Sequence, residues 1–253
     1  MKATVIIPAR YASSRFPGKP LALLGGTPLI VRVLEQVSKT GLQAFVATDD
    51  DRIFRCVAEA GGFPVMTRPD HACGTDRVRE AAEKCAPDAD IIVNLQGDEP
   101  FIRPDQVQAL VDIFNRHPDT DIATLVRPLP PDTTGDTLSD PALVKAVVAD
   151  DGEALYFSRF PVPYLRGLPV ERWAASHTYF AHIGIYAYRM SALRAVTEMA
   201  PSSLEKAESL EQLRWLQAGM RIRTASTQWA TIGIDTPQDL AAAELHIAST
   251  QLL

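Results

Sequence analysis

Three cations lie close together in one short segment near the N-terminus: Arg10, Arg15 and Lys19. An arginine presents a planar fork of N–H donors to phosphate oxygens, and a lysine presents a compact charge. The segment follows an apolar run that we interpret as the first strand. A basic loop at the carboxyl end of a strand is typical of phosphate binding, and a solvated basic loop is the alternative. The position favours a site for a nucleotide triphosphate.

Two common phosphate-binding motifs are absent from this segment. Gly18-Lys19 resembles the end of a P-loop, but Pro20 follows where that motif has Ser or Thr. Ser13 also stands where the motif has its leading glycine. The GxGxxG fingerprint of dinucleotide-binding folds is missing as well. Kinase-type and dehydrogenase-type functions therefore lose support.

A carboxylate, Asp98, follows another apolar run and comes directly after Gly97. Mg²⁺ prefers oxygen ligands and often binds through one or two carboxylates together with substrate phosphates. Asp98 is therefore a candidate Mg²⁺ ligand, and Glu99, which precedes Pro100, is a less certain one. The alternative is a turn that uses Gly-Asp chemistry.

Asp235 is a second candidate ligand near the C-terminus. It ends an apolar stretch, and Thr236-Pro237 begins an expected helix. Asp and Thr are ordinary helix N-cap residues, so capping is the simpler interpretation. If Asp98 and Asp235 reach the same edge of a sheet, however, they would share one metal ion.

Other polar residues have a structural interpretation beside a functional one. His182 lies in an expected strand, and a lone histidine is more often structural than catalytic. Glu211 and Gln212 belong to an acidic amphipathic segment, and they gain interest only if they face a polyhydroxyl substrate. Arg77 follows the glycine entry to a helix. It would meet a substrate carboxylate, or pair with an acidic residue of its own helix, Glu80 or Glu83.

Strands alternate with helices over the first half of the chain. We expect strands at 3–7, 44–47, 90–95 and 122–126. The expected helices begin with Thr27 as N-cap and Pro28 as first residue, and continue at 53–58, 75–85 and 104–116. This alternation predicts an α/β fold with a mostly parallel sheet and helices on both faces. In such sheets ligands bind outside the carboxyl ends of the strands.

The second half is less regular. Residues 128–141 and 161–173 are rich in proline and predict irregular connections. Strands are expected at 144–149 and 155–158 with no helix between them. We interpret this region as a small antiparallel insertion, where such proteins often dimerise. We expect another strand at 183–188 and helices at 203–217 and 237–248. The prediction is one domain over residues 1–253 with a dimerisation insertion around 128–180.

The composition is that of an ordinary globular protein of 253 residues, 46% apolar and 22% charged. The net charge of −6 favours neither nucleic acid nor an acidic membrane surface as a partner, so an anionic substrate would need local cations. The three cysteines lack CxxC spacing, which indicates reduced thiols rather than disulfides or zinc ligands. No signal peptide or transmembrane segment is apparent. We expect a cytoplasmic protein.

Eight segments in combination resemble the 3-deoxy-manno-octulosonate (Kdo) cytidylyltransferases. They cover nearly the whole chain in the family's order: IIPARYASSRFPGKPL, VATDD, GTDRVRE, IVNLQGDEP, LYFSRFPVPY, HIGIYAYR, LEKAESLEQLRWLQAG and GIDTPQDL. RxPGKP alone occurs in other sugar nucleotidyltransferases. LxxxExLEQLR together with HIGIY is much more specific.

The resemblance implies a Rossmann-like nucleotidyltransferase fold and Mg²⁺ dependence. It implies transfer of CMP from CTP to the anomeric hydroxyl of Kdo, with release of pyrophosphate, for lipopolysaccharide biosynthesis. It also implies a homodimer. No serine or cysteine with a base partner is evident, so we expect direct attack of the sugar hydroxyl on the α-phosphorus rather than a covalent intermediate.

The resemblance also assigns roles to individual positions. Lys19, Asp98 and Asp235 would be catalytic, and the two aspartates would hold the metal. Nucleotide binding is assigned to Pro8, Ala9, Arg10, Ser14, Arg15, Lys19 and Gly74. The sugar acid would be surrounded by Arg77, Gln96, His182, Tyr186, Glu211 and Gln212. The sequence departs from the family at Cys73, where Ser is frequent, and at Gln238, where Glu is frequent. Neither departure removes a proposed ligand.

Three other functions compete with this one. The first is a nucleotidyltransferase for another sugar acid, such as an amino-Kdo or a sialic acid. The second is a glycosyltransferase with a metal motif at residues 48–51, in which the basic loop at 10–19 has no clear task. The third is a non-catalytic nucleotide sensor, which would tolerate the loss of Asp98 or Asp235.

Overall fold

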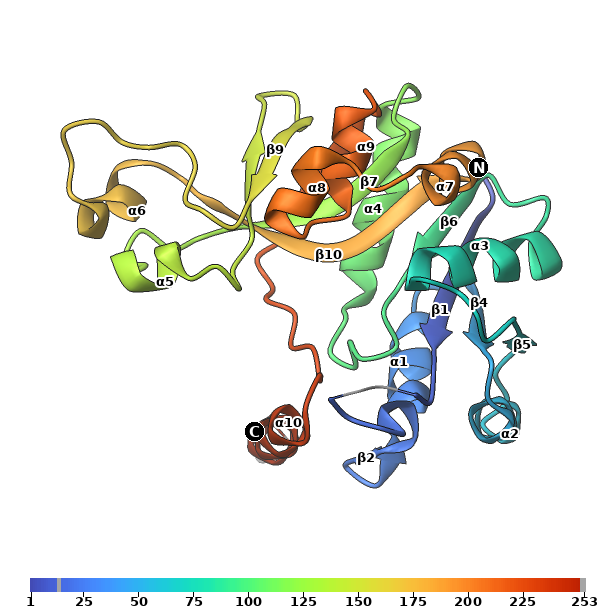
Figure 1. Ribbon diagram of the computed structural model, residues 1–253. Coiled ribbons are helices and arrows are strands. Elements are labelled where there is room, and N and C mark those ends of the chain that lie inside the picture. Colours follow the sequence, from blue (N-terminus) through green and yellow to red (C-terminus); the bar gives the residue numbers. More distant parts are fainter. Residues whose placement is uncertain (13–14, 251–253) are drawn as a thin grey trace. The chain divides into compact units, whose positions relative to one another are not determined.

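The computed structural model describes residues 1–12 and 15–250, without the side chains of 248–250. The chain divides into two compact units (Figure 1). The first comprises residues 1–108 and the segment from Thr231 onward, and the second comprises residues 109–230. One domain over residues 1–253 stays a prediction.

The first unit contains four parallel strands in the order β6, β1, β4, β5. They are β1 (Ala3–Ala9), β4 (Gln43–Thr48), β5 (Pro64–Met66) and β6 (Ile91–Asn94). Val5, Ile6 and Ile7 are fully buried, as expected for a parallel strand covered on both faces. The register aligns Ile6 with Phe45 and Asn94, so the carboxyl ends of β1, β4 and β6 meet at one edge. This confirms three predicted strands.

Helices flank these strands along the chain: α1 (Leu29–Ser38), α2 (Asp51–Glu59), α3 (Gly74–Cys85) and α4 (Pro104–Arg116), through which the chain enters the second unit. The apolar stripe of α1 is buried at Leu29, Ile30, Val33 and Val37. Asp50 caps α2, since its carboxylate accepts a hydrogen bond from the Arg52 amide. All four helices were expected from their apolar periodicity.

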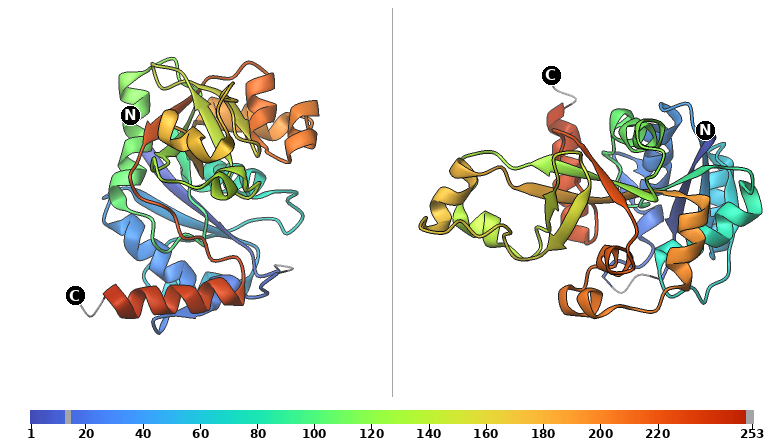
Figure 2. Two further views of the ribbon diagram at one scale, coloured as in Figure 1. Left: turned by 90° about the vertical axis from the view of Figure 1, so that its left-hand side faces the viewer. Right: turned by 90° about the horizontal axis from the view of Figure 1, so that it is seen from above.

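The expected start of the first helix is wrong. Pro28 is extended and is the N-cap of α1, and Thr27–Pro28 forms strand β3. β3 pairs with β2 (Leu23–Leu24) in a hairpin, whose turn contains Gly25 and Gly26 with φ of 56° and 76°. Helix α10 (Pro237–Thr250) packs on this hairpin through Leu24, Leu29, Ile234 and Ala243 (Figure 2). The hairpin supplies an apolar surface that a simple helix start would not.

The second unit contains the predicted antiparallel strands. β7 (Ile122–Pro128) pairs with β10 (Phe180–Arg189) in antiparallel orientation and with β11 (Ile222–Ser226) in parallel. β8 (Lys145–Val148) is antiparallel to both β10 and β9 (Ala154–Ser158). Three helices were not predicted: α5 (Gly135–Ser139), α6 (Trp173–Ser176) and α7 (Met190–Glu198).

The expected single helix over 203–217 is wrong. It divides into α8 (Ser203–Glu208) and α9 (Gln212–Gln217), because Ser209 adopts a left-handed conformation with φ of 53°. The break is anchored on β9, since the Glu208 carboxylate accepts hydrogen bonds from Ser158 Oγ at 2.7 Å and the Arg159 amide at 2.9 Å. Tertiary contacts thus override a sequence that favours one helix.

Across the described residues, no helix is both long enough and apolar enough to cross a membrane.

Candidate active site

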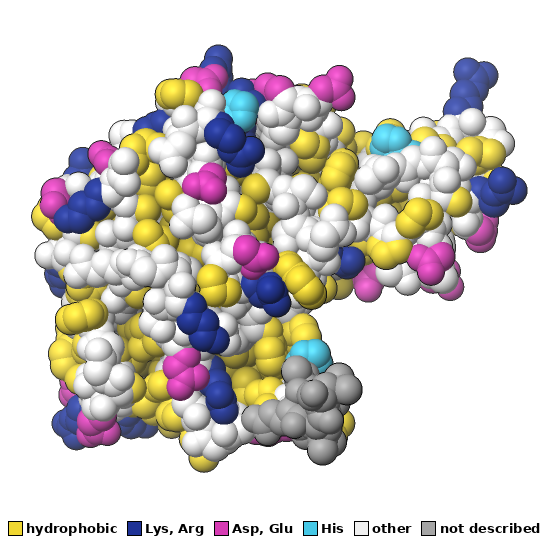
Figure 3. All heavy atoms as spheres, turned by 180° about the vertical axis from the view of Figure 1, so that it is seen from behind, with side chains coloured by type: hydrophobic (Ala, Val, Ile, Leu, Met, Phe, Trp, Pro, Cys, Tyr) yellow, Lys and Arg dark blue, Asp and Glu magenta, His cyan; other side chains and the backbone are white. Residues whose placement is uncertain are grey.

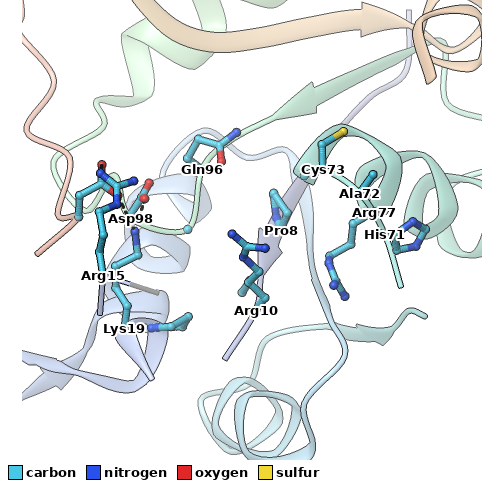
Figure 4. A pocket seen from close by; sticks show the side chains of 15 residues that line it. Pro8, Arg10, Arg15, Lys19, His71, Ala72, Cys73, Arg77, Gln96 and Asp98 are labelled. Atoms are coloured by element: carbon cyan, nitrogen blue, oxygen red, sulfur yellow. Dashed lines mark hydrogen bonds and ion pairs between the residues drawn. The ribbon is translucent and has the colours of Figure 1, made fainter. Parts of the chain in front are cut away.

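A cavity of about 430 Å³ lies in the first unit, where the carboxyl ends of β1 and β6 meet. Figure 4 shows side chains from four segments pointing into it. Pro8 and Ala9 come from the end of β1, and Arg10, Arg15 and Lys19 from the loop that follows. The remaining lining residues are His71, Ala72, Cys73, Gly74 and Arg77 around the start of α3, Gln96, Gly97 and Asp98 after β6, Asp235 before α10, and Pro20.

Lys19 joins two carboxylates that are far apart in the sequence. Its Nζ lies 2.5 Å from Asp98 Oδ2 and 3.1 Å from Asp235 Oδ1. Arg15 Nη1 lies 3.2 Å from the other oxygen of Asp235. The two aspartates that a shared metal would require are therefore together at one edge of the sheet. Figure 4 shows Lys19 and Asp98 there.

Backbone contacts bring these carboxylates together. The Ile234 amide donates to the Asp98 carbonyl oxygen at 3.0 Å, which joins the segment before α10 to the loop after β6. Gly97 allows a close approach here, because a Cβ would lie 3.1 Å from the Pro8 carbonyl oxygen. The capping carboxylate of α10 is Asp239, which accepts from the amides of Asp235 and Thr236. The Asp235 side chain faces Lys19 and Arg15 instead, so the simple capping interpretation does not hold for it.

Glu99 is a third carboxyl beside this pair. Its burial, together with the charges of Asp98 and Asp235, raises its pKa to about 8, although Lys19 opposes the shift. Within the described part of the chain its Oε2 has no hydrogen-bond partner. From the sequence, Glu99 was a less certain candidate for a Mg²⁺ ligand than Asp98. The structure places it where negative charge is already concentrated.

Arg77 is buried at the other end of the cavity. It donates from Nη1 to Thr67 Oγ1 at 2.6 Å and from Nη2 to Asp49 Oδ2 at 2.8 Å. Its ion-pair partner is thus a residue that follows β4, rather than Glu80 or Glu83 of its own helix. Thr67 was not singled out from sequence, and Asp49 was considered only as part of the metal motif at residues 48–51 in the glycosyltransferase alternative. A carboxylate directly after a predicted strand was the available signal for Asp49.

His71 is a cavity residue that sequence reasoning missed. Its Nε2 contacts Glu80 of α3, which also accepts from the Arg68 amide and from Lys84 Nζ. Burial opposes the ionisation of Glu80, but the hydrogen bonds from Lys84, Arg68 and His71 lower its pKa to about 2. Glu80 therefore stays ionised and holds the segment that leads into α3.

The remaining predicted residues of the first unit are also accounted for. Gln96 lines the cavity and donates to Asn94 Oδ1 at 3.2 Å. Gly74 is the first residue of α3, and a Cβ there would lie 3.7 Å from the Pro8 ring. Ser14 lies outside the described residues.

The other four predicted sugar-binding residues lie in the second unit. His182 and Tyr186 are on β10, with ring centroids 5.5 Å apart. His182 Nε2 is 3.0 Å from Thr124 Oγ1, and burial lowers the pKa of His182 to about 3. Burial and the charge of Glu211 raise the pKa of Tyr186 well above its ordinary value. His182 and Tyr186 are therefore both uncharged at neutral pH.

Glu211 and Gln212 stand at the start of α9. Gln212 is buried, and Glu211 Oε1 lies 3.5 Å from Arg214 Nη2. Glu211 is thus not merely part of a solvated helix face, because its charge acts on the buried Tyr186. His182, Tyr186 and Glu211 thus act on one another within the second unit, and Gln212 follows Glu211 in the chain.

Comparison with known proteins extends over nearly the whole chain. The family described as "Cytidylyltransferase" matches residues 4–222. The 3-deoxy-manno-octulosonate cytidylyltransferase of Porphyromonas gingivalis is 50% identical over 96% of both chains, and that of Phocaeicola vulgatus is 52% identical over 98% of both.

Solved structures agree with this similarity. CMP:2-keto-3-deoxy-manno-octonic acid synthetase complexed with CTP is 43% identical with a TM-score of 0.90, and the match covers 99% of this chain and all of that one. A cytidylyltransferase from Leptospira borgpetersenii is 18% identical with a TM-score of 0.64, and the match covers 98% of this chain and 87% of that one. The second likeness supports the fold alone.

Proposed function

This chain belongs to the 3-deoxy-manno-octulosonate (Kdo) cytidylyltransferase family, and we propose that it transfers CMP from CTP to the anomeric hydroxyl of Kdo with release of pyrophosphate. One observation of the structure carries this proposal. Lys19, Asp98 and Asp235 converge beside a cavity that is also lined by Arg10 and Arg15. A nucleotidyl transfer needs cations for a triphosphate and carboxylates for a metal within one site.

Arg10, Arg15 and Lys19 bind the triphosphate in this proposal. The chain carries a net charge of −6, so the attraction for CTP has to come from cations concentrated in the cavity. Figure 4 shows Arg10 between the end that contains Lys19 and Asp98 and the end that contains Arg77 and His71. Pro8, Ala9 and Gly74 border the same space and would contact the nucleotide there.

The carboxylates of Asp98 and Asp235 fit a Mg²⁺ ion. An oxygen of each lies within 3.1 Å of one ammonium nitrogen, so a single cation reaches both groups. All the donors are carboxylate oxygens, which Mg²⁺ prefers, and phosphate oxygens of the substrate complete such sites. When bound, Mg²⁺ would polarise the α-phosphoryl group and lower the pKa of the attacking hydroxyl.

The chain's own residues contribute position and charge. The anomeric oxygen forms a bond to the α-phosphorus as the bond to pyrophosphate breaks, and the hydroxyl proton passes to solvent. Arg10, Arg15 and Lys19 stabilise the charge that develops on the leaving pyrophosphate. Cysteine chemistry is not needed, and burial keeps Cys85 a neutral thiol by raising its pKa to about 11.

The sugar acid is assigned to Arg77 and Gln96 of the first unit and to His182, Tyr186, Glu211 and Gln212 of the second. The uncharged His182 and Tyr186 suit the hydroxyls of a sugar acid better than its carboxylate. Arg77 already donates to Asp49 and Thr67, so it would contact the substrate through its remaining N–H groups.

The enzyme is further proposed to be a cytoplasmic homodimer with one nucleotidyltransferase domain and an insertion around 128–180 that forms the interface. Three side chains of the insertion support this, since Leu155, Phe160 and Tyr164 are 60%, 65% and 69% exposed. Cys56, Cys73 and Cys85 form no disulfide with one another, which is compatible with a reducing compartment.

A panel of acceptors tests the proposed reaction. The protein is incubated with CTP and Mg²⁺ and with Kdo, an amino-Kdo or a sialic acid, and sugar nucleotides are identified by mass spectrometry. We expect CMP-Kdo as the main product. Formation of only another CMP-sugar would overturn Kdo as the acceptor and keep the transfer. Consumption of a UDP-sugar, or CTP binding without turnover, would instead favour the glycosyltransferase or the sensor.

A further inference from the structure

One backbone hydrogen bond joins the two ends of the basic loop in the nucleotide site. The Gly18 amide donates to the Tyr11 carbonyl oxygen at 3.0 Å. Gly18 has a φ of 72°, and a Cβ built on it would lie 3.1 Å from the Tyr11 ring. The aromatic ring therefore lies directly against the Gly18 backbone. Arg10 precedes Tyr11 and Lys19 follows Gly18. This contact therefore positions the backbone from which both basic side chains extend.

Arg52 of α2 covers the Tyr11 ring. The carbon of its guanidinium lies 3.3 Å from the ring centroid, well within the range of a cation–π contact. Arg52 is not among the residues that line the nucleotide cavity. The Tyr11 ring is thus the contact that connects Arg52 to the basic loop.

Asp50 holds Arg52 in this position. Arg52 donates from Nε to Asp50 Oδ1 at 2.9 Å and from Nη2 to Asp50 Oδ2 at 2.7 Å. These hydrogen bonds lower the pKa of Asp50, so the carboxylate stays ionised. Asp50 is also the N-cap of α2, which ties the orientation of the guanidinium to the helix itself. A two-point contact of this kind restricts a planar guanidinium far more than an ammonium.

We propose that Arg52 is a positioning residue of the nucleotide site, which holds the triphosphate loop in place by stacking on Tyr11 and so presents Arg10 and Lys19 to CTP. This assignment rests on the proposed nucleotide site. α2, the Tyr11 ring and Gly18 form one continuous brace, from a helix that does not contact CTP to the lysine that does. Without it, the free energy of positioning Arg10 and Lys19 would be subtracted from the binding of CTP.

Calorimetric titration of CTP, which needs no sugar acceptor, tests this role. We expect Arg52→Leu to weaken CTP binding about two- to fivefold, the range of an exposed cation–π contact. Arg52→Lys should retain part of the affinity, and Tyr11→Phe nearly all of it because the ring remains. Arg55→Leu, which removes the same charge from an exposed position of α2, should bind CTP like the unmodified protein. Thermal melting establishes that each variant is folded.

A double-mutant cycle separates a brace from independent contacts. If Arg52 acts through Tyr11, Tyr11→Leu combined with Arg52→Leu should bind CTP no more weakly than Tyr11→Leu alone. In turnover assays Arg52→Leu should raise KM for CTP and leave KM for the sugar acid unchanged. Additive losses in the cycle, or unchanged CTP binding by folded Arg52→Leu, would overturn the assignment. Since binding is read without an acceptor, an error about Kdo as the substrate would leave these results intact.

Discussion

Lys19 occupies the position between Asp98 and Asp235 at which a divalent cation would contact both carboxylates. Its side chain is only 14% exposed, so little solvent weakens the attraction to the two charges. The same ammonium is the group that we assign to the phosphates of CTP. In the proposed site, a metal ion and Lys19 would therefore compete for one pair of carboxylates when CTP is absent. Binding of a triphosphate would give Lys19 a second anionic partner. It would thereby favour binding of the metal ion to the two carboxylates.

This competition predicts an unusual gain of affinity. Lys19→Met should bind Mn²⁺ at least about tenfold more tightly in the absence of CTP, because a close ion pair of partly buried groups amounts to a few kcal/mol. The same variant should bind CTP more weakly. Electron paramagnetic resonance of Mn²⁺ titrated into the protein measures the first effect, and calorimetry measures the second.

Lys84→Met is the matched control, since Lys84 pairs with Glu80 at 2.6 Å and its removal changes the net charge equally. It should leave Mn²⁺ affinity as it is. Equal Mn²⁺ affinity of Lys19→Met and the unmodified protein would contradict the competition.

The sequence predicted the residues of this site better than their contacts. Lys19 and Asp98 were candidates because both follow apolar strands, and ligands bind outside the carboxyl ends of the strands in such sheets. Asp235 did not, because an aspartate before Thr-Pro has the composition of a helix cap, and only the structure shows Asp239 in that role. His71 gave no signal as a lone histidine, since its contact with Glu80 depends on how the segment before α3 folds back.

The position of α3 at the cavity depends on a half-buried acidic residue. Glu80 accepts hydrogen bonds from the Arg68 amide and from Lys84 Nζ, and it contacts His71, which lines the cavity. It thereby fixes the segment between β5 and α3 against the helix. Gly74 and Arg77 of the same helix are both cavity residues.

Glu80→Gln should therefore destabilise the protein by about 2–3 kcal/mol at neutral pH. The pKa of Glu80 is lowered in the folded state to about 2, so its contribution is present above the unfolded value near 4.5 and is lost as the pH falls toward 2. The difference in unfolding free energy between the variant and the unmodified protein should be constant from pH 7 to 5 and shrink below it. Urea unfolding at several pH values measures this. A difference that grows toward acid pH would contradict the assignment.

Helices and strands with strong apolar periodicity were predicted from the sequence. Elements that depend on pairing or contacts with distant segments were not. The alternation of β1, α1, β4, α2 and their successors follows from apolar stripes and buried runs. β5 and β11 are short and interrupted by polar or exposed residues, so only their pairing with β4 and β7 identifies them. The division between α8 and α9 depends on Ser209 and on the contacts of Glu208, which lie fifty residues away in the chain.

The chain as a whole has an excess of acidic residues. On the face that Figure 3 shows, basic and acidic side chains intermingle, so charges of one sign do not form a large patch there. Attraction of CTP is therefore a local property of the cavity. Composition predicted that the attraction would come from local cations. Exposed apolar side chains such as Phe160 and Tyr164 could not be distinguished from core residues by sequence.

The proposed dimer predicts a specific sensitivity of the insertion. Replacing both Phe160 and Tyr164 by Glu should convert a dimer into a monomer, because charges would be buried without partners in the interface. Sedimentation equilibrium reports the mass. Leu245→Glu, at a residue of α10 that is 74% exposed, should remain dimeric. A monomeric unmodified protein, or a double variant that is still dimeric, would exclude this interface.

The release of pyrophosphate from CTP and Mg²⁺, with and without Kdo, tests the central claim most directly. The unmodified protein should release pyrophosphate only when Kdo is present. Asp98→Asn should be folded but slower by at least about 100-fold, because it loses half of the metal-binding pair. Asp88→Asn, which alters an exposed carboxylate paired with Lys2, should match the unmodified enzyme. Near-normal release by Asp98→Asn, or no Kdo-dependent release by a folded protein that binds CTP, would contradict the account.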